Sequence, residues 1–215
     1  AGTYGAQTGM VKADKPAFNR NDTFYGSFCS GLCDKGHYCP LNSTVPTQIP
    51  CPPGRYGSFL GQVDEKCEAV CPLGHFCVSG TVLPVKCPAG LFGNTTGLGS
   101  AACSTECWEA GCKLNQCQEG YYCPEGSSWA TQHECGGPDL YCPTGSAAPT
   151  KVTDGWYTIG PFPYEDAMKR VSQQICPVGY YCVKGSKVKC PPGTYGNSRG
   201  LSDPSCTGPC GKGFY

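Results

Sequence analysis

Apolar positions are scattered along this chain of 215 residues, and 31 Gly and 20 Pro interrupt them every few positions. Gly and Pro break helices and confine strands to short lengths. The pattern therefore predicts short β-hairpins over most of the chain. No apolar stretch approaches the about 20 residues that a helix needs to cross a bilayer, so no membrane span is predicted.

One segment, Tyr164–Ile175, carries a helical pattern. Its acidic residues come first and its basic residues follow, an order that suits the helix dipole. Met168, Val171 and Ile175 fall at positions i, i+3 and i+7, which gives the segment one apolar face. We expect about three helical turns around 164–175, and these need tertiary support because short helices are marginal in isolation.

The cysteines repeat at fixed intervals, which sets the domain organisation. After the opening Cys51-Pro-Pro-Gly-Arg-Tyr-Gly, intervals of fifteen, three, five and nine residues lead to Cys67, Cys71, Cys77 and Cys87. Similar openings at Cys87 and Cys190 are each followed by the same first two intervals. Because Pro fixes φ and Gly admits positive φ, each opening predicts a tight turn. We expect the hairpins to stack in tandem as an elongated rod in which each unit touches only its neighbours.

The spacing divides the chain into five parts. These are a partial repeat with a long first loop (1–50), a regular repeat (51–86), a repeat with irregular extra cysteines (87–134), a divergent repeat (135–189) and a partial repeat (190–215). The divergent part contains a Cys-free insertion, Lys151–Gln174, to which the pattern assigns no role. Because Gly2-Thr-Tyr-Gly matches Gly193-Thr-Tyr-Gly, we expect the chain to be a window from a longer array.

The composition indicates that disulfides, more than burial of apolar side chains, stabilise the fold. Leu, Ile, Val and Phe make up about 15% of the chain, below the roughly 20% at which a chain builds a core by burial alone. Its 20 Cys amount to about 9%, which is typical of a disulfide scaffold. Cytosolic thiols are kept reduced, so we expect an extracellular protein. The net charge of zero gives no electrostatic footprint for nucleic acid.

The pairing of the cysteines stays open between two patterns, because four cysteines allow three pairings. We favour nearest neighbours over the interleaved pattern, first to third and second to fourth. This leaves Cys29 and Cys210 with partners outside the chain. The favoured pairs are Cys33–Cys39, Cys51–Cys67, Cys71–Cys77, Cys87–Cys103, Cys176–Cys182 and Cys190–Cys206, and we also expect Cys117 and Cys123 in disulfides.

The repeat resembles the Eph-receptor-like cysteine-rich repeat, a relative of epidermal-growth-factor-like and tumour-necrosis-factor-receptor modules. The resemblance rests on Cys-Pro-Pro-Gly-x-Tyr-Gly at Cys51 and Cys190 and on Gly-Tyr-Tyr-Cys at Cys123 and Cys182. The segment Glu134–Pro149 is similar to segments of protist members. The resemblance implies a large extracellular protein and points to fibres, surface coats or flagellar hairs (mastigonemes).

Candidate chemistry is sparse. His37 and His75 share a repeat position that Tyr121, Tyr180 and Phe214 occupy elsewhere. Since Phe cannot replace a catalytic imidazole, we interpret both as packing residues, and His133 as a surface residue.

The spacings Cys67/Cys71 and Cys103/Cys107 are formally compatible with zinc, but a secreted framework favours disulfides. Asp64-Glu65 and Glu165-Asp166 are isolated pairs, too few for calcium. We therefore expect no metal, no cofactor and no enzymatic activity.

Three sequons of the form Asn-x-Ser/Thr predict attached N-glycans, at Asn21, Asn42 and Asn94. Two functions fit the whole pattern. The first is a structural protein that assembles with copies of itself or with other extracellular fibre proteins. The second is a receptor or adhesion ectodomain in which the repeats form a spacer or a ligand-binding stalk.

Overall fold

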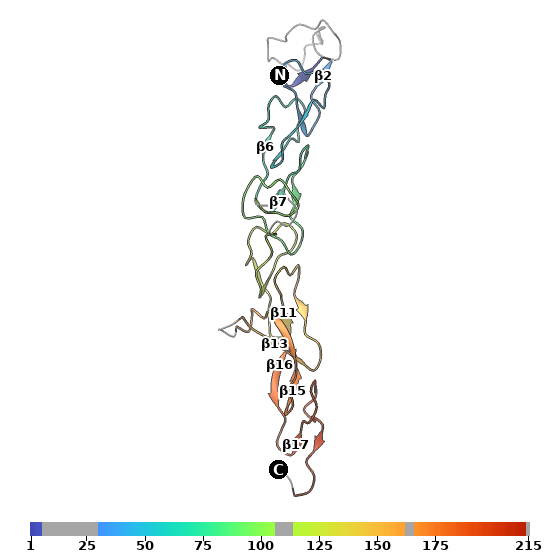
Figure 1. Ribbon diagram of the computed structural model, residues 1–215, viewed down its shortest axis with the longest axis vertical. Coiled ribbons are helices and arrows are strands. Elements are labelled where there is room, and N and C mark those ends of the chain that lie inside the picture. Colours follow the sequence, from blue (N-terminus) through green and yellow to red (C-terminus); the bar gives the residue numbers. More distant parts are fainter. Residues whose placement is uncertain (6–29, 106–113, 162–165, 214–215) are drawn as a thin grey trace, which may run out of the picture. The chain divides into compact units, whose positions relative to one another are not determined.

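The computed structural model describes residues 1–5, 30–105, 114–161 and 166–213. These residues contain no helix, and their eighteen strands pair as nine two-stranded antiparallel hairpins (Figure 1). This confirms the small disulfide-rich fold of tandem hairpins. The pairs are β1 (Thr3–Tyr4) with β2 (Gly31–Leu32), β3 (His37–Tyr38) with β4 (Ile49–Pro50), β5 (Arg55–Tyr56) with β6 (Ala69–Val70), β7 (His75–Phe76) with β8 (Val85–Lys86), β9 (Tyr121–Tyr122) with β10 (His133–Glu134), β11 (Leu140–Tyr141) with β12 (Thr150–Lys151), β13 (Trp156–Ile159) with β14 (Ser172–Ile175), β15 (Tyr180–Val183) with β16 (Ser186–Lys189), and β17 (Thr194–Tyr195) with β18 (Gly208–Pro209).

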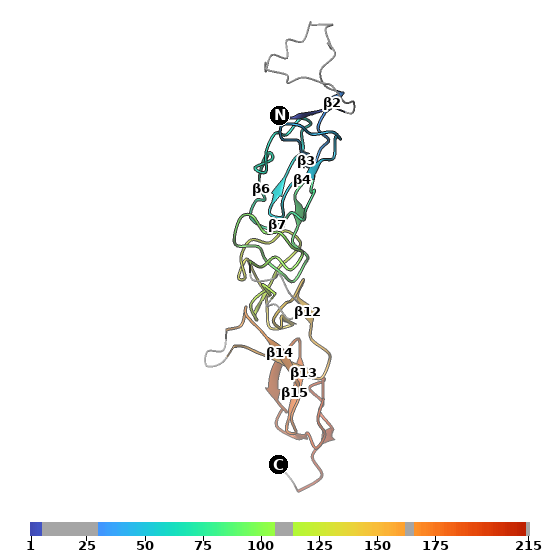
Figure 2. The same ribbon diagram turned by 45° about the horizontal axis from the view of Figure 1, so that its top comes forward.

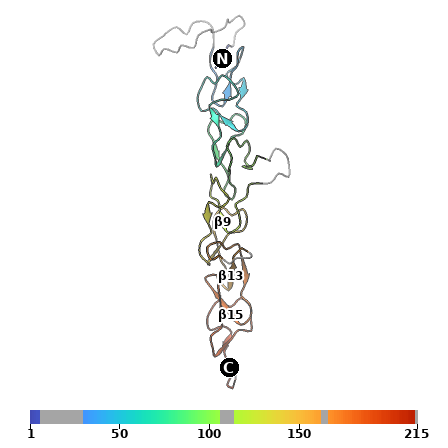
Figure 3. The same cartoon turned by 90° about the vertical axis from the view of Figure 1, so that its left-hand side faces the viewer.

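The hairpins form two compact units. The first comprises Ala1–Cys87 with Gly93–Lys113, and the second comprises Pro88–Phe92 with Leu114–Tyr215. Within the second unit β9, β13 and β15 follow one another in chain order (Figure 3). Each unit is therefore a succession of hairpins.

A tight turn leads into each regular hairpin. In Cys51-Pro-Pro-Gly the N–H of Arg55 donates to the carbonyl of Pro52 over 3.1 Å, and Gly54 takes φ +85°. A type II turn requires positive φ at its third residue, which explains the Gly of the motif. The same Pro-to-strand bond recurs at His75, Leu91, Tyr180 and Thr194.

Backbone hydrogen bonds connect each hairpin with the next two. The N–H of Gly54 donates to the carbonyl of Cys77, and the carbonyl of Gly54 accepts from the N–H of Cys71. In turn, the carbonyl of Cys71 accepts from the N–H of Gly97, in the loop two hairpins further on. Equivalent bonds start from Gly36 and Gly90. Contact limited to nearby hairpins along the chain is the organisation of repeat proteins.

The core of the described chain consists mostly of sulfur. Every buried hydrophobic residue is a cysteine except Leu98 and Val152. Leu98 is 1% exposed and packs with the Cys87–Cys103 disulfide and Phe76. Because the sequence has few aliphatic residues, disulfide-bonded cysteines occupy most of the buried hydrophobic positions.

The expected helix around 164–175 is wrong over the described residues. Ser172–Ile175 is strand β14, which lies beside β13 (Figure 2) and pairs Trp156 with Ile175 and Ile159 with Ser172. Before it, the carboxylate of Asp166 accepts the N–H of Met168 over 2.8 Å in a turn. The described chain offers no aliphatic core on which the apolar face of a helix could pack. A strand, in contrast, completes its backbone hydrogen bonds by pairing with β13. Residues 164 and 165 lie outside the described chain.

One step of the divergent part keeps the geometry of the repeat without a disulfide. Gly155-Trp-Tyr-Thr158 aligns with Gly179-Tyr-Tyr-Cys182, and Val152 stands where Cys176 stands. Val152 is 8% exposed and Thr158 is 3% exposed. The Thr158 hydroxyl donates to the carbonyl of Pro138. A buried Val–Thr pair therefore takes the place of a short disulfide, and the Cys-free insertion contains β13 and most of β14.

The region with irregular cysteines contains a regular hairpin. Cys117, Cys123 and Cys135 have the same spacing as Cys33, Cys39 and Cys51. In both hairpins a serine hydroxyl donates over 2.7 Å to the carbonyl three residues earlier, from Ser43 and from Ser127. The irregularity therefore lies before Cys117.

Replacing the leading glycine of a hairpin tests how closely the hairpins fit. Gly155 (φ +77°) and Gly179 (φ +78°) belong to the same unit, but an added Cβ meets the Gly200 carbonyl at Gly155 and nothing within 4 Å at Gly179. Both Ala variants carry the cost of positive φ, about 1–2 kcal/mol. We expect Gly155→Ala to lower the free energy of unfolding by a further amount of about 1–3 kcal/mol, because backbone must move. Urea unfolding measures this, and equal losses in the two variants would contradict the close fit.

Candidate functional site

The disulfides hold the hairpins, and with them the loops that carry the candidate site residues. The described residues contain eight disulfides, all between nearest neighbours in sequence, and the interleaved pattern does not occur among them. Cys210 is the one described cysteine outside a disulfide, and Cys29 lies outside the described chain. Five disulfides span six or seven residues, Cys33–Cys39, Cys71–Cys77, Cys117–Cys123, Cys135–Cys142 and Cys176–Cys182, and three span sixteen, Cys51–Cys67, Cys87–Cys103 and Cys190–Cys206.

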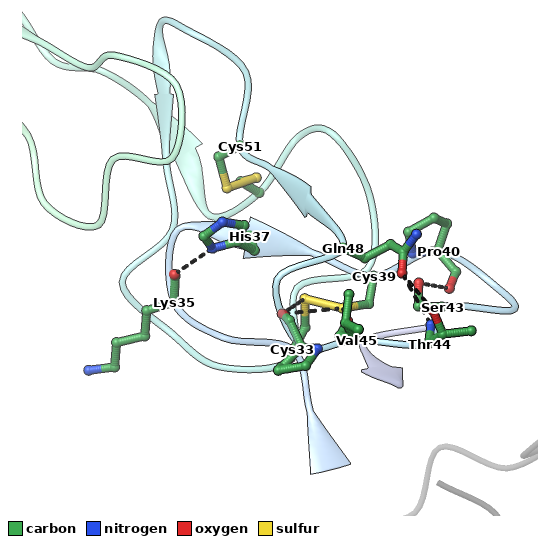
Figure 4. Close-up of a disulfide and its surroundings, with 12 residues drawn as sticks. Cys33, Lys35, His37, Cys39, Pro40, Ser43, Thr44, Val45, Gln48 and Cys51 are labelled. Atoms are coloured by element: carbon green, nitrogen blue, oxygen red, sulfur yellow. Dashed lines mark hydrogen bonds between the residues drawn. A yellow bond between two sulfur atoms is a disulfide. The ribbon is translucent and has the colours of Figure 1, made fainter. Parts of the chain in front are cut away.

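A short disulfide joins the end of one hairpin to the first strand of the next. Figure 4 shows Cys33, after β2, bonded to Cys39, after β3. The sulfur of Cys33 lies 3.0 Å from the carbonyl oxygen of Pro46, and that of Cys117 lies 3.1 Å from the carbonyl of Ala130. Since a disulfide sulfur carries no hydrogen, these are close contacts that anchor the return loop.

A long disulfide closes the loop of the following hairpin. Cys67, Cys103 and Cys206 each have φ between 50° and 53°, a left-handed conformation that is uncommon outside Gly. Asp64 stabilises the turn before Cys67 by accepting the N–H of Lys66 over 2.9 Å. Asp203 does the same at Cys206, where hydrogen bonds from Ser205 lower the pKa of the carboxyl. Asp64 is exposed, and its carboxylate also stabilises this turn.

The histidines make structural contacts. His37 and His75 are half-buried at the start of their strands, and each ring Nδ1 lies within 3.1 Å of the carbonyl oxygen two residues earlier, that of Lys35 for His37 (Figure 4). His133 stacks on Tyr122, its partner across the strand pair, with ring centroids 5.2 Å apart. The stacking gives His133 a packing role that its polar sequence surroundings did not indicate.

One cluster of charged side chains lies in the second unit. The Lys169 ammonium is 3.1 Å from Asp166 and 3.4 Å from Glu134, and it lies over the ring of Tyr121. The hydrogen bond to Asp166 raises the pKa of Lys169, while the Met168 N–H and then Lys169 lower the pKa of Asp166. Lys169 also packs against Gly120, where a Cβ would lie 3.0 Å from its own. The cluster is exposed and connects the insertion, through Lys169, to Glu134 and Tyr121 of the hairpin β9–β10.

No group of three or more His, Cys, Asp or Glu that could hold a metal ion occurs in residues 1–5, 30–105, 114–161 and 166–213. The same residues contain no helix long and apolar enough to span a membrane.

Two of the three sequons lie in the described chain. Asn42 and Asn94 are exposed in the loops of their hairpins, and Asn21 lies outside the described residues. Asn42 has φ 69° and stands where the matching hairpin has Gly126, with φ 82°. Asn accepts this conformation more readily than most residues. Both side chains are open to solvent, as a glycan attachment point must be.

Comparisons with known proteins add no assignment: no family model matches the chain, and no curated protein matches it. The residues themselves therefore have to carry any functional conclusion.

Restoring the missing sulfur tests the equivalence of Val152 and Thr158 to a short disulfide. We expect Val152→Cys/Thr158→Cys to form a new disulfide and to raise the free energy of unfolding by about 2 kcal/mol in the chain-entropy model. Thiol titration under denaturing, non-reducing conditions and urea unfolding measure the two effects. Thr158→Ser serves as the control and adds no crosslink. Two additional free thiols in the double variant would show that the positions are not equivalent.

Replacing the sequon asparagines by glutamine, in protein secreted from eukaryotic cells, tests glycan attachment. We expect Asn42→Gln and Asn94→Gln each to lower the intact mass by one glycan, because both asparagines are exposed sequon residues. Asn197→Gln, at an exposed asparagine followed by Ser-Arg, is the matched control and leaves the glycan mass unchanged. A wild-type mass that does not change on enzymatic deglycosylation would disprove attachment at these positions.

Proposed function

We propose that this is a non-enzymatic extracellular structural protein. Its disulfide-stapled hairpin repeats form a stiff element that assembles into a fibre, a surface coat or a flagellar hair of the mastigoneme type. The resemblance of the repeat to Eph-receptor-like cysteine-rich modules belongs to the same proposal.

The observation that carries the proposal is the covalent bond at nearly every step between hairpins. Disulfides such as Cys71–Cys77 join consecutive hairpins, and the backbone bonds of Gly54 and Gly97 reach no further than two hairpins along the chain. A chain built this way resists local unfolding at each step, because each crosslink limits the freedom of the unfolded segment. Resistance of this kind suits a load-bearing extracellular element.

Burial of sulfur also supports an extracellular location. Sixteen cysteines of the described chain are in disulfides, and such bonds persist in oxidising compartments. The exposed sequon residues Asn42 and Asn94 fit the same compartment. The zero net charge does not oppose association between copies.

Exposed apolar side chains offer surfaces for assembly in the first unit. Phe59 is 64% exposed, Leu60 52% and Leu83 65%. Aromatic residues on the first strands, such as Tyr38, Tyr56 and Phe76, are half-buried against the chain. Association between copies, or with other fibre proteins, therefore rests on these loop residues more than on a free stripe of tyrosines.

A receptor or adhesion ectodomain is the second candidate. It is favoured by a shallow groove beside β13 and β14, whose lining includes Trp156, Tyr157 and Arg199. In that function the repeats form the spacer and the divergent hairpin contacts a ligand.

Electron microscopy of the native protein, isolated without reduction, distinguishes the two functions. We expect regular filaments, because a regular succession of hairpins and exposed apolar loops favour repetitive association. The matched sample is the same preparation after reduction and alkylation, which we expect to lose the filaments. Monodisperse particles in the native sample, together with a membrane anchor in the full-length gene, would establish the receptor function instead.

A further inference from the structure

The zero net charge of the chain conceals an uneven distribution of charge along the second unit. Residues 114–150 contain no Lys or Arg and four acidic residues, Glu119, Glu125, Glu134 and Asp139. Residues 167–202 contain no Asp or Glu and six basic residues, Lys169, Arg170, Lys184, Lys187, Lys189 and Arg199. Both stretches belong to the same compact unit. The unit therefore carries its negative and its positive charges on different parts of the chain.

The positive charges concentrate on the hairpin of β15 and β16, which we call the basic hairpin. All four residues of β16 are exposed, and Lys187 and Lys189 lie on one face of the strand because side chains alternate. A third exposed lysine, Lys184, lies in the two-residue loop between the strands. The ammonium of Lys187 lies over the rings of Tyr157 and Tyr180, 4.8 Å and 5.4 Å from their centroids. Four residue pairs between β15 and β16 fix this arrangement.

The negative charges lie around the hairpin of β9 and β10, which we call the acidic hairpin together with the turns that flank β9. Glu119 lies in the turn before β9 and Glu125 in the turn after it, and both are exposed. The Cys117–Cys123 disulfide crosslinks the segment that contains β9. This hairpin is therefore held as firmly as the basic one.

Ion pairs within the chain leave both hairpins with charges that have no counterion. Among the described residues only Lys169 forms ion pairs, with Asp166 and with Glu134 of β10. The second of these pairs joins the basic stretch to the acidic stretch, so the two attract each other wherever they meet. The lysines of the basic hairpin, and Glu119 and Glu125 of the acidic hairpin, remain available to a partner.

We propose that the basic hairpin of one copy of this chain binds the acidic hairpin of another copy. The proposal rests on the assembly proposed above and assigns the surfaces that meet. Opposite charges on exposed surfaces steer partners together and fix their register. An acidic polysaccharide would neutralise the lysines but would leave the acidic hairpin without a partner. A second copy is the occupant that accounts for both hairpins.

The chemistry of the contact also determines the form of the assembly. The acidic and the basic hairpin are different surfaces of one chain, so the contact between copies is heterologous. Each contact leaves one hairpin of each kind free for a further copy. A heterologous contact that does not close on itself produces an open filament. The charge pattern of the second unit therefore favours a fibre over a closed dimer.

Sedimentation velocity of the disulfide-bonded 215-residue chain tests the contact. We expect assemblies larger than a dimer in about 0.01 M NaCl and their dissociation in about 1 M NaCl, because the Debye length falls from about 30 Å to about 3 Å. Contacts between exposed charges are screened over this range, whereas contacts between apolar loops are not.

Reversing the charges identifies the two hairpins. Lys184→Glu/Lys189→Glu reverses the basic hairpin and keeps Lys187 on its tyrosines, and Glu119→Lys/Glu125→Lys reverses the acidic hairpin. We expect each double variant alone to lower the association constant at least about tenfold, because like charges then meet. An equimolar mixture of the two is expected to associate again, since the unaltered acidic hairpin of the first meets the unaltered basic hairpin of the second. Restored association also shows that both variants fold.

Lys86→Glu/Lys151→Glu is the matched control for net charge. It replaces two exposed lysines that lie outside both hairpins. Each change shifts the charge by two units, so the net charge goes from zero to −4, as it does in the reversal of the basic hairpin. We expect the control to associate as the wild type does.

Four outcomes would overturn the assignment. They are assemblies unaffected by salt, assemblies that stop at a dimer, equal losses in the control and in Lys184→Glu/Lys189→Glu, and a mixture that stays dissociated. A wild-type chain that stays monomeric in low salt and binds polygalacturonate through its lysines would assign the basic hairpin to a polysaccharide instead. In each case electron microscopy of the native protein still decides the structural function, so the two proposals are judged separately.

Discussion

The buried disulfide is the interaction on which the rest of this structure depends. Most strands contain two residues, and a two-stranded hairpin of that length is at best marginal in water. The chain has too few aliphatic residues to cover such hairpins, and its buried hydrophobic positions are almost all cysteines. Sulfur therefore fills the volume that Leu and Ile fill elsewhere, and it also joins most hairpins covalently to the next. Because one atom type serves both purposes, the fold tolerates polar loops of very different length.

Glycine provides the second constraint, which acts on the backbone. At Gly36, Gly54, Gly90 and Gly155 the carbonyl of a loop two hairpins further on occupies the space of a side chain. The disulfides set which strands meet, and these backbone contacts set how far apart the hairpins lie. Coupling along each unit is thus strictly local, as in repeat proteins whose stability sums over neighbours. A change at one hairpin is expected to reach two hairpins and no more.

Much of the fold could be predicted from the sequence because cysteine spacing reports hairpin geometry directly. The intervals around Cys51 and Cys190 predicted turns, strands and disulfide-rich packing without reference to burial. The prediction failed where cysteines are missing. The spacing of Met168, Val171 and Ile175 suits a helix, but a helix there would need an aliphatic core to pack its apolar face, and the described chain has none. Sequence spacing could have found the Val152–Thr158 equivalence, since their interval of six matches Cys176–Cys182. The groove could not be found this way, because Arg199 comes from a different hairpin and the spacing does not relate it to Trp156.

The divergent hairpin shows what happens when the sulfur constraint is relaxed. Val152 and Thr158 keep the buried positions of a disulfide, and β13 and β14 share four residue pairs, as β15 and β16 do, whereas the other hairpins share two. Longer strands present more side chains to solvent in a fixed register, and nothing in the disulfide framework dictates their chemistry. In the regular hairpins the two strand residues mostly pack against the chain and leave few positions for other use. A surface for another function is therefore most readily accommodated on longer strands such as β13 and β14, where four residue pairs fix the register.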